Sequence, residues 1–297
     1  MATRGPIFIG GAGRSGTTLA VDMLGLHPEV SPVYETGFVS QIAGLVFGRR
    51  DLSKQQVQIA IIQLMDRWSQ SLPHIPHQKR AHERYHHGPH YIRFDRPFAM
   101  ARTVELVDAL DAGNRVMGFN RFVNALFAEH ARLDGKPRWA NKTPSYVHLL
   151  PVLGSIFPEM RFLHCVRDGR AVAASVVTRS WGPSNVTEAA TWWSRKTQLG
   201  VDWGRANPDR YFELRYEALL TRPQQTLSAL LDFLGEVDCA AEMLASYRGG
   251  VTLDASRAST WRSRFSDQDY ADFNAAAGGL LVQLGYEQGA QQVALGA

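Results

Sequence analysis

Cysteine is scarce in this sequence of 297 residues: only Cys165 and Cys239 occur, and they do not form a Cys-x-x-Cys pair. The sequence therefore excludes a disulfide framework, and this composition is typical of a reducing compartment. Cys165 lies in the apolar run 162–166. We expect it to be a buried strand residue rather than a nucleophile.

Long apolar runs and basic tracts are also missing. No stretch of about 18 apolar residues occurs, so no membrane span is expected. The N-terminus enters a strand-like run without an apolar leader and cleavage site, which predicts a cytoplasmic location. The 32 Lys and Arg against 28 Asp and Glu give a formal charge of +4 without a Lys/Arg run. This pattern argues against a nucleic-acid partner and is compatible with an anionic ligand.

Short apolar segments alternate with segments of helical periodicity along the chain. The segments that read as strands are 6–10, 30–34, 138–142, 160–166 and 211–216. Their alternation with helices predicts an α/β fold, with a P-loop-type parallel sheet of about four to five strands flanked by helices. Because 45% of the residues are hydrophobic and no linker or repeat is visible, we expect residues 1–297 to form one domain.

Residues 40–135 form a mostly helical excursion from this pattern, with helices expected at 40–48, 55–70, 99–112 and about 119–133. Within it, the stretch 73–97 carries six histidines among prolines and arginines. Their spacing matches neither His-Glu-x-x-His nor a Cys/His zinc pattern. We therefore expect an irregular, solvated loop or lid there, and no metal site.

The strand at 6–10 runs directly into a glycine-rich loop at 11–18, which a helical pattern follows. The loop fits the phosphate-binding pattern G-x-x-x-x-G-K-[S/T], except that Thr17 replaces the lysine that reaches the β- and γ-phosphates. A ligand with one phosphate in the loop has no need of that lysine, and Arg14 supplies a forked donor instead. Backbone N–H groups at such a helix start bind phosphate. The predicted ligand contacts are Gly13, Arg14, Ser15, Gly16, Thr17 and Thr18.

A second candidate anion site follows the segment 160–166. Arg167 stands at the end of that strand, and Ser175 follows about two helical turns further along the chain. Doubly wound sheets bind ligands at the carboxyl ends of their strands, where both side chains can meet one anion. Asp168 is expected to cap the helix that begins there, and a purely capping role for Arg167 is the alternative.

Four blocks stand out together: Gly-Arg-Ser-Gly-Thr-Thr-Leu at 13–19, His-Pro-Glu-Val at 27–30 followed by Glu35, Asn-Lys-Thr-Pro at 141–144, and 162–179. In order and spacing they resemble the sulfotransferase superfamily that uses 3′-phosphoadenosine-5′-phosphosulfate (PAPS). Within it they are most similar to the tyrosylprotein sulfotransferases. The blocks correspond to that family's 5′-phosphosulfate loop, base segment, lysine block and 3′-phosphate block. Weaker similarity lies at 216–219 and 261–266.

This resemblance implies transfer of a sulfuryl group from PAPS to the hydroxyl of an alcohol or phenol, without a metal. It implies that Glu35 is the general base, while Lys142 and Arg14 stabilise the bridging and leaving oxygens. On the 3′-phosphate and adenine side it implies roles for Arg167, Ser175, Arg179, Tyr216, Trp261 and Arg262. For Trp261, packing in the core is an equally good interpretation.

The acceptor is less defined, because the chain departs from the tyrosylprotein enzymes at two positions. Tyr34 replaces an acid before the base, and Gly37 replaces an arginine after it. Hydroxyl-bearing small molecules and peptide tyrosines both stay open, with residues 40–135 expected to shape the site. Trp192 and Trp193 are candidates for its wall or for the core. A P-loop kinase or other nucleoside-triphosphate enzyme, and an inactive nucleotide-binding protein, are the alternative functions.

Overall fold

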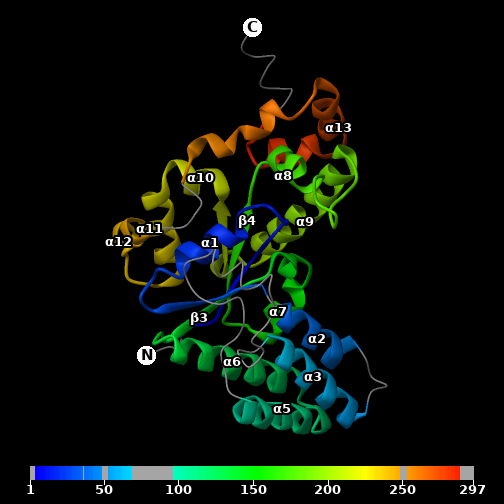
Figure 1. The fold of residues 1–297 in the computed structure, drawn as a ribbon, viewed down its shortest axis with the longest axis vertical. Coiled ribbons are helices and arrows are strands. Elements are labelled where there is room, and N and C mark those ends of the chain that lie inside the picture. The colour runs from blue at the N-terminus through cyan, green and yellow to red at the C-terminus, as the bar shows by residue number, and fades with distance from the viewer. Residues whose placement is uncertain (1–3, 36, 49–52, 69–95, 248–252, 288–297) are drawn as a thin grey trace.

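A computed structural model describes residues 4–35, 37–48, 53–68, 96–247 and 253–287 of the chain (Figure 1). Its centre is a parallel sheet with strand order β2-β3-β1-β4-β5. The strands are β1 (Ile7–Gly11), β2 (Val30–Val33), β3 (Arg138–Lys142), β4 (Arg161–Val166) and β5 (Tyr211–Arg215). The predicted α/β class and all five predicted strands are confirmed.

The register of the sheet brings the candidate residues to one edge. Ile9 of β1 lies between Lys142 of β3 and Leu163 of β4, and Gly11 lies beside Cys165. Since all pairs are parallel, the strands β2, β3, β1 and β4 end at the same edge of the sheet. The glycine-rich loop after β1 is therefore flanked by the ends of β3 and β4, as expected for a ligand site of this fold class.

Helices cover both faces of the sheet, because the central strands are apolar on both sides. On one face, the side chains of Ile7, Ile9 and Leu163 pack with helices α1 (Thr17–Leu24), α10 (Tyr216–Thr221), α11 (Pro223–Leu234) and α12 (Ala240–Ser246). On the other face, Phe8 and Phe162 pack with the 3₁₀ turn η1 (Pro144–His148), α7 (Leu150–Ile156) and α6 (Arg115–Leu133).

The excursion 40–135 is mostly helical where the structure describes it. It contains α2 (Phe38–Gly48), α3 (Lys54–Trp68), α5 (Arg96–Asp111) and α6, which gather at one end of the molecule in Figure 1. Helix α6 is nevertheless part of the main core, since the ring of Phe127 lies edge-on to Trp139 of β3 at 4.9 Å. The predicted irregular stretch 73–97 lies almost wholly outside the described residues.

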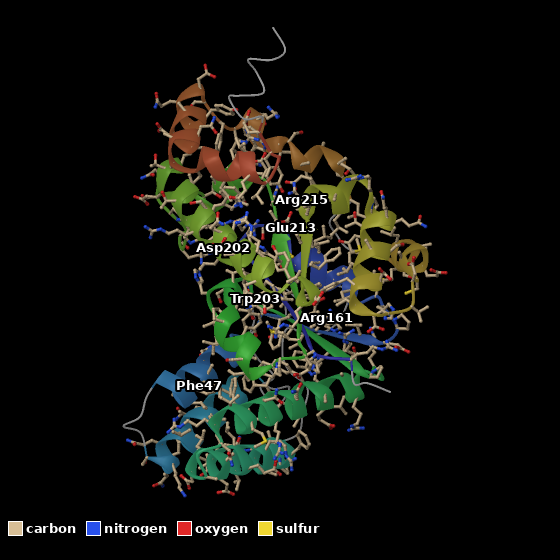
Figure 2. All side chains as sticks on the ribbon, turned by 180° about the vertical axis from the view of Figure 1, so that it is seen from behind. Phe47, Arg161, Asp202, Trp203, Glu213 and Arg215 are labelled. Atoms are coloured by element: carbon tan, nitrogen blue, oxygen red, sulfur yellow. The ribbon has the colours of Figure 1, made fainter. Side chains whose placement is uncertain are left out.

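The opposite end consists of α8 (Gly169–Val176), α9 (Val186–Ala206) and α13 (Asp267–Gln283). Figure 2 shows the other side of the molecule, where Glu213 and Arg215 lie on the edge strand β5. These two side chains form an ion pair at 2.8 Å. Charged side chains on an edge strand discourage pairing with a second sheet.

Some helices were not expected from the sequence. Helices α10 and α12 have six and seven residues, too few to show an amphipathic repeat. The segment after β3 forms two short elements separated by Leu149, since η1 ends before this residue and α7 begins after it with Pro151 in its first turn. Proline favours that position because it has no N–H to leave unpaired.

Candidate active site

The loop between β1 and α1 has the conformation of an anion cradle. Ser15 folds back on it, its hydroxyl donating to the Ala12 carbonyl at 2.6 Å. Arg14 and Gly16 both adopt positive φ angles, 72° and 93°. The loop leads directly into the first turn of α1, whose backbone N–H groups have no acceptor within the helix. These donors and the positive end of the helix dipole suit a phosphate or sulfuryl group.

Gly16 is required here for two independent reasons. Its left-handed φ is costly for other residues, by about 1–3 kcal/mol. In addition, a Cβ atom at this position would lie 2.5 Å from Cδ2 of Tyr216. The ring of Tyr216 therefore packs directly on the loop backbone.

We expect Gly16→Ala to weaken binding of an adenosine bisphosphate by about tenfold or more and to lower the unfolding temperature. Gly44→Ala is the matched control, because Gly44 lies within α2 and a Cβ atom there would meet no neighbouring side chain within 4 Å. That control is expected to be neutral or stabilising, since alanine is the better helix former. Calorimetric titration and thermal unfolding measure both effects. Equal affinities for G16A and wild type would contradict this account of the loop.

Arg167 forms a second positive centre beside the loop. Its guanidinium lies 4.2 Å from the centre of the Tyr216 ring, on which it stacks. It donates to the carbonyls of Arg14 at 3.1 Å and Arg257 at 3.2 Å. In the described part of the chain it has no carboxylate partner, and its buried Nε has no hydrogen-bond acceptor. A partly buried cation without a counter-ion is a site for an anionic ligand.

Arg14 joins the two positive centres. Its Nε donates to the Ser175 hydroxyl of α8 at 3.0 Å, while its carbonyl accepts from Arg167. The structure therefore brings together four residues from three separate sequence motifs: Arg14, Arg167, Ser175 and Tyr216. The loop and the end of β4 are thus in contact, so the two candidate anion positions are neighbours.

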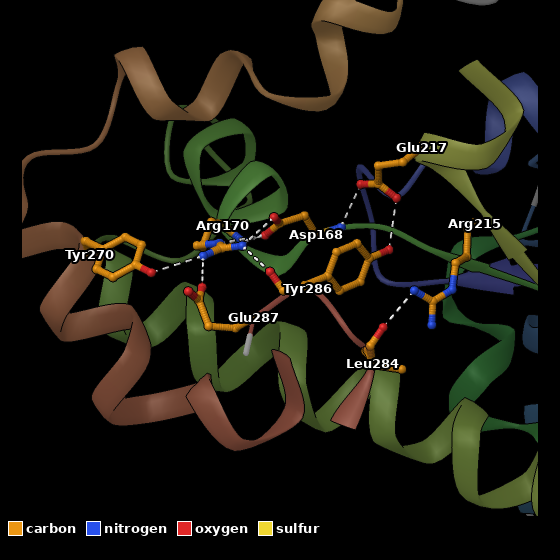
Figure 3. Close-up of polar contacts among 8 residues, drawn as sticks. All are labelled: Asp168, Arg170, Arg215, Glu217, Tyr270, Leu284, Tyr286 and Glu287. Carbon is orange, nitrogen blue, oxygen red and sulfur yellow. Dashed lines mark hydrogen bonds and ion pairs between the residues drawn. The ribbon is translucent and has the colours of Figure 1, made fainter. Parts of the chain in front are cut away.

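A network below this surface holds Arg167 in place (Figure 3). Asp168 caps α8, accepting from the backbone N–H of Arg170 at 2.9 Å, as predicted, and also forms an ion pair with the Arg170 side chain at 2.8 Å. Glu217 accepts from the backbone N–H of Asp168 and from the Tyr286 hydroxyl, both at 2.9 Å. Burial raises the pKa of Glu217. These contacts fix the backbone on either side of residue 168.

Lys142 and Glu35 meet at the ends of β3 and β2. The Lys142 ammonium donates to Glu35 Oε2 at 3.1 Å. The lysine side chain is only 3% exposed, whereas that of Glu35 is 50% exposed. The neighbouring Asn141 ties the two strand ends together, since its amide donates to the Val33 carbonyl at 3.0 Å. A buried ammonium and an accessible carboxylate thus lie side by side at the sheet edge.

A second carboxyl lies near the same lysine. Asp22 of α1 accepts a hydrogen bond from the Tyr34 hydroxyl at 2.6 Å. Burial raises the pKa of Asp22 to about 7, although the Tyr34 hydrogen bond and the charge of Lys142 both act to lower it. Sequence reasoning missed Asp22, because an acid within an amphipathic helix carries no motif.

Comparison with known proteins identifies the family of this chain. Residues 6–238 match the pattern of the Sulfotransferase family. The chain belongs to the sulfotransferase family. It is 27% identical over 265 residues to "Protein-tyrosine sulfotransferase 1" of Danio rerio and 28% identical over 269 residues to "Protein-tyrosine sulfotransferase 2" of Gallus gallus. Each match covers 86% of this chain but only 61% and 58% of the relative, so the chain spans about three fifths of their length.

Two solved sulfotransferase domains have the same fold. One is the "Sulfotransferase Domain from the Curacin Biosynthetic Pathway", with a TM-score of 0.56, 21% identity and coverage of 97% of this chain and 99% of that one. The other comes from the "Synechococcus PCC 7002 Olefin Synthase", with a TM-score of 0.54, 22% identity and coverage of 92% and 95%. At these identities the likeness concerns the fold alone.

Two tryptophans flank the loop between β1 and α1. A Cβ atom at Gly13 would lie 3.2 Å from the ring of Trp192 and 3.5 Å from that of Trp181, which is 61% exposed. Trp193, by contrast, is fully buried and packs on Phe273 at 5.7 Å. The two adjacent tryptophans of α9 therefore have different roles. Trp181 was missed because an isolated aromatic residue in a loop gives no pattern.

A groove of about 480 Å³ lies along α9, with Trp192 in its lining. The Lys196 ammonium lies 4.9 Å from the centre of the Trp192 ring and 2.7 Å from His148 Nε2, which accepts its hydrogen bond. Burial lowers the pKa of Lys196. Within the described ranges Lys196 has no carboxylate partner. The lining of this groove thus combines an aromatic ring, the cations Arg195 and Lys196, and the acid Glu188.

Of three further residues predicted for the nucleotide side, one is buried and two are exposed. Trp261 is 4% exposed, and its ring is covered by the guanidinium of Arg170 at 4.3 Å and that of Arg262 at 4.7 Å. This packing agrees with the core interpretation of Trp261. Arg179 and Arg262 are both exposed. Their contacts with a nucleotide stay predictions.

Two further features of the described residues concern metal binding and membrane-spanning helices. The described ranges contain no group of three or more His, Cys, Asp or Glu side chains arranged to hold a metal ion. The six histidines of 74–90 fall outside them. None of the described helices combines the length and apolar character needed to cross a bilayer.

Proposed function

We propose that this sulfotransferase takes its sulfuryl group from PAPS and transfers it to a hydroxyl acceptor. The observation that carries the proposal is the pair of anion positions joined by Arg14. PAPS has a phosphosulfate on its 5′ carbon and a separate phosphate on its 3′ carbon. The α1 loop suits the first group, and the uncompensated guanidinium of Arg167, with Ser175, suits the second.

The chain's own residues would then act as follows. Glu35 accepts the proton of the acceptor hydroxyl, for which its exposure is needed, and Lys142 donates to the oxygen on which negative charge develops. Arg14 and the first N–H groups of α1 hold the 5′ group in line with the acceptor. When bound, PAPS supplies the activated sulfuryl group, and no metal is needed in this scheme.

For the acceptor, we propose a phenolic hydroxyl, as on a peptide tyrosine or an aromatic small molecule. Trp181 and Trp192 lie against Gly13 of the loop and offer aromatic surfaces beside the transfer point. The names of the two curated relatives support a protein tyrosine. We also propose the cytoplasm as the location, on the scarcity of cysteine, and residues 40–135 as part of the acceptor site.

Calorimetric titration with 3′-phosphoadenosine-5′-phosphate, AMP and ATP–Mg²⁺ tests the donor. We expect a micromolar or lower Kd for the bisphosphate and values at least about 30-fold higher for the other two, since the charged contact at Arg167 contributes about 2 kcal/mol or more. Preference for ATP–Mg²⁺ would instead support a nucleoside-triphosphate enzyme. Tight bisphosphate binding without turnover of labelled PAPS on tyrosine peptides or phenols would support an inactive binding protein.

A further inference from the structure

Asp22 is a buried acid beside the transfer site that the proposed scheme does not use. It lies on α1 and is 6% exposed, and its hydrogen-bond donor Tyr34 is 1% exposed. Their contact of 2.6 Å is a short O–H···O hydrogen bond. An acid in such a place lowers stability when it is ionised, unless a nearby positive charge compensates for it. The structure supplies such a charge in Lys142, which acts on Asp22 electrostatically.

The position of Tyr34 links this acid to Glu35. Tyr34 directly precedes Glu35, and its ring is fixed between α1 and the sheet by the bond to Asp22. On the other side, Asn141 holds the Val33 carbonyl, and Lys142 follows Asn141 on β3. The ends of β2 and β3 are therefore each anchored one residue before the functional side chain. Asp22 anchors β2, and Asn141 joins it to β3.

We propose that Asp22 is a positioning residue that orients Glu35 through Tyr34 and serves as the second counter-charge of Lys142. The proposal rests on the function proposed above. During transfer, Glu35 accepts the proton of the acceptor hydroxyl, whose oxygen bonds to sulfur while the bond from sulfur to the 5′-phosphate oxygen breaks. The electron pair stays on that oxygen. Glu35 is then neutral, and the ionised form of Asp22 is the acid that still interacts electrostatically with the buried ammonium.

The charge relation is tested without any turnover, by a cycle of Asp22→Asn, Lys142→Met and the double variant in thermal unfolding. Asparagine keeps the shape and an acceptor oxygen for Tyr34, but it cannot ionise. Because the folded protein raises the pKa of Asp22 from 3.8 to about 7, ionisation costs stability as the pH rises through that range. D22N should therefore unfold at a higher temperature than wild type at pH 8 and at the same temperature near pH 4.

The gain from D22N at pH 8 should be larger by about 2 °C or more in the K142M background, where the counter-charge is gone. Equal gains in unfolding temperature in the two backgrounds would show that Asp22 and Lys142 do not interact electrostatically. This result is read from folding alone, so it stands even if the chain fails to use PAPS.

The positioning role is tested by turnover with PAPS. We expect D22N and Tyr34→Phe each to lower kcat about tenfold, with the affinity for 3′-phosphoadenosine-5′-phosphate within threefold of wild type. In wild type we expect kcat to rise with pH near 7 as Asp22 ionises, and this rise should vanish in D22N. Asp232→Asn, an exposed acid on α11, is the control and should leave both unchanged. Wild-type kcat and pH profile in D22N would overturn the positioning role, whereas failure of wild type to bind the bisphosphate would overturn the proposed function.

Discussion

Glu35→Gln is expected to lower the rate of sulfuryl transfer by about 10²–10⁴-fold, the range measured when a positioned general base is lost. Glutamine keeps the size of the side chain and an oxygen that accepts from the Lys142 ammonium, so the hydrogen bond seen at 3.1 Å is retained. Only the ability to take a proton is removed. Since Glu35 belongs to neither anion position, the affinity for 3′-phosphoadenosine-5′-phosphate should stay within about threefold of wild type.

The measurement is single-turnover transfer from labelled PAPS, run beside calorimetry with the bisphosphate. Glu29→Gln is the matched control, because Glu29 is a partly exposed acid that pairs with Arg4 away from the site. It should transfer at the wild-type rate. If E35Q also transfers at that rate, another group is the base, and the ion pair with Lys142 would have only a structural role.

Arg167→Ala should weaken binding of 3′-phosphoadenosine-5′-phosphate by about 30- to 100-fold, corresponding to about 2–3 kcal/mol for a charge-assisted contact that is partly buried. Binding of AMP, which lacks the 3′-phosphate, should change by about threefold or less. A small effect on AMP is expected because Arg167 also donates to the Arg14 carbonyl and so supports the loop. The two ligands together separate a direct contact from loss of loop geometry.

Arg205→Ala controls for the change in net charge, since Arg205 is an exposed residue at the end of α9 that pairs with Asp202. Its affinities should equal those of wild type. A loss of affinity of the same size for AMP and the bisphosphate in R167A would show that Arg167 does not bind the 3′-phosphate and only supports the loop.

The sequence alone determined the class of fold and the two ligand-facing motifs. The five strands were predictable because buried parallel strands are short, continuous apolar runs, as at 160–166, and because a glycine-rich loop between a strand and a helix has few other uses. Arg167 was proposed from its place at the end of a predicted parallel strand. Glu35 and Lys142 were found only through the resemblance to a family, since a single charged residue at a strand end has no pattern of its own. Their catalytic and binding roles stay proposals.

Only the tertiary structure decided which of these residues meet. Arg14 and Ser175 are 161 positions apart, and their bond depends on the adjacency of β1 and β4 in the sheet, which local sequence does not encode. The different places of Trp192 and Trp193 were also decided by the tertiary structure. Trp193 is buried against Phe273, whereas Trp192 lies at the loop, because consecutive residues of a helix point in different directions. A role for Asp22 could not be predicted from the sequence, because the residues that act on it, Tyr34 and Lys142, lie on two other segments of the chain. Pairwise contacts between distant segments arise when the layers pack, and that packing turns scattered residues into a site.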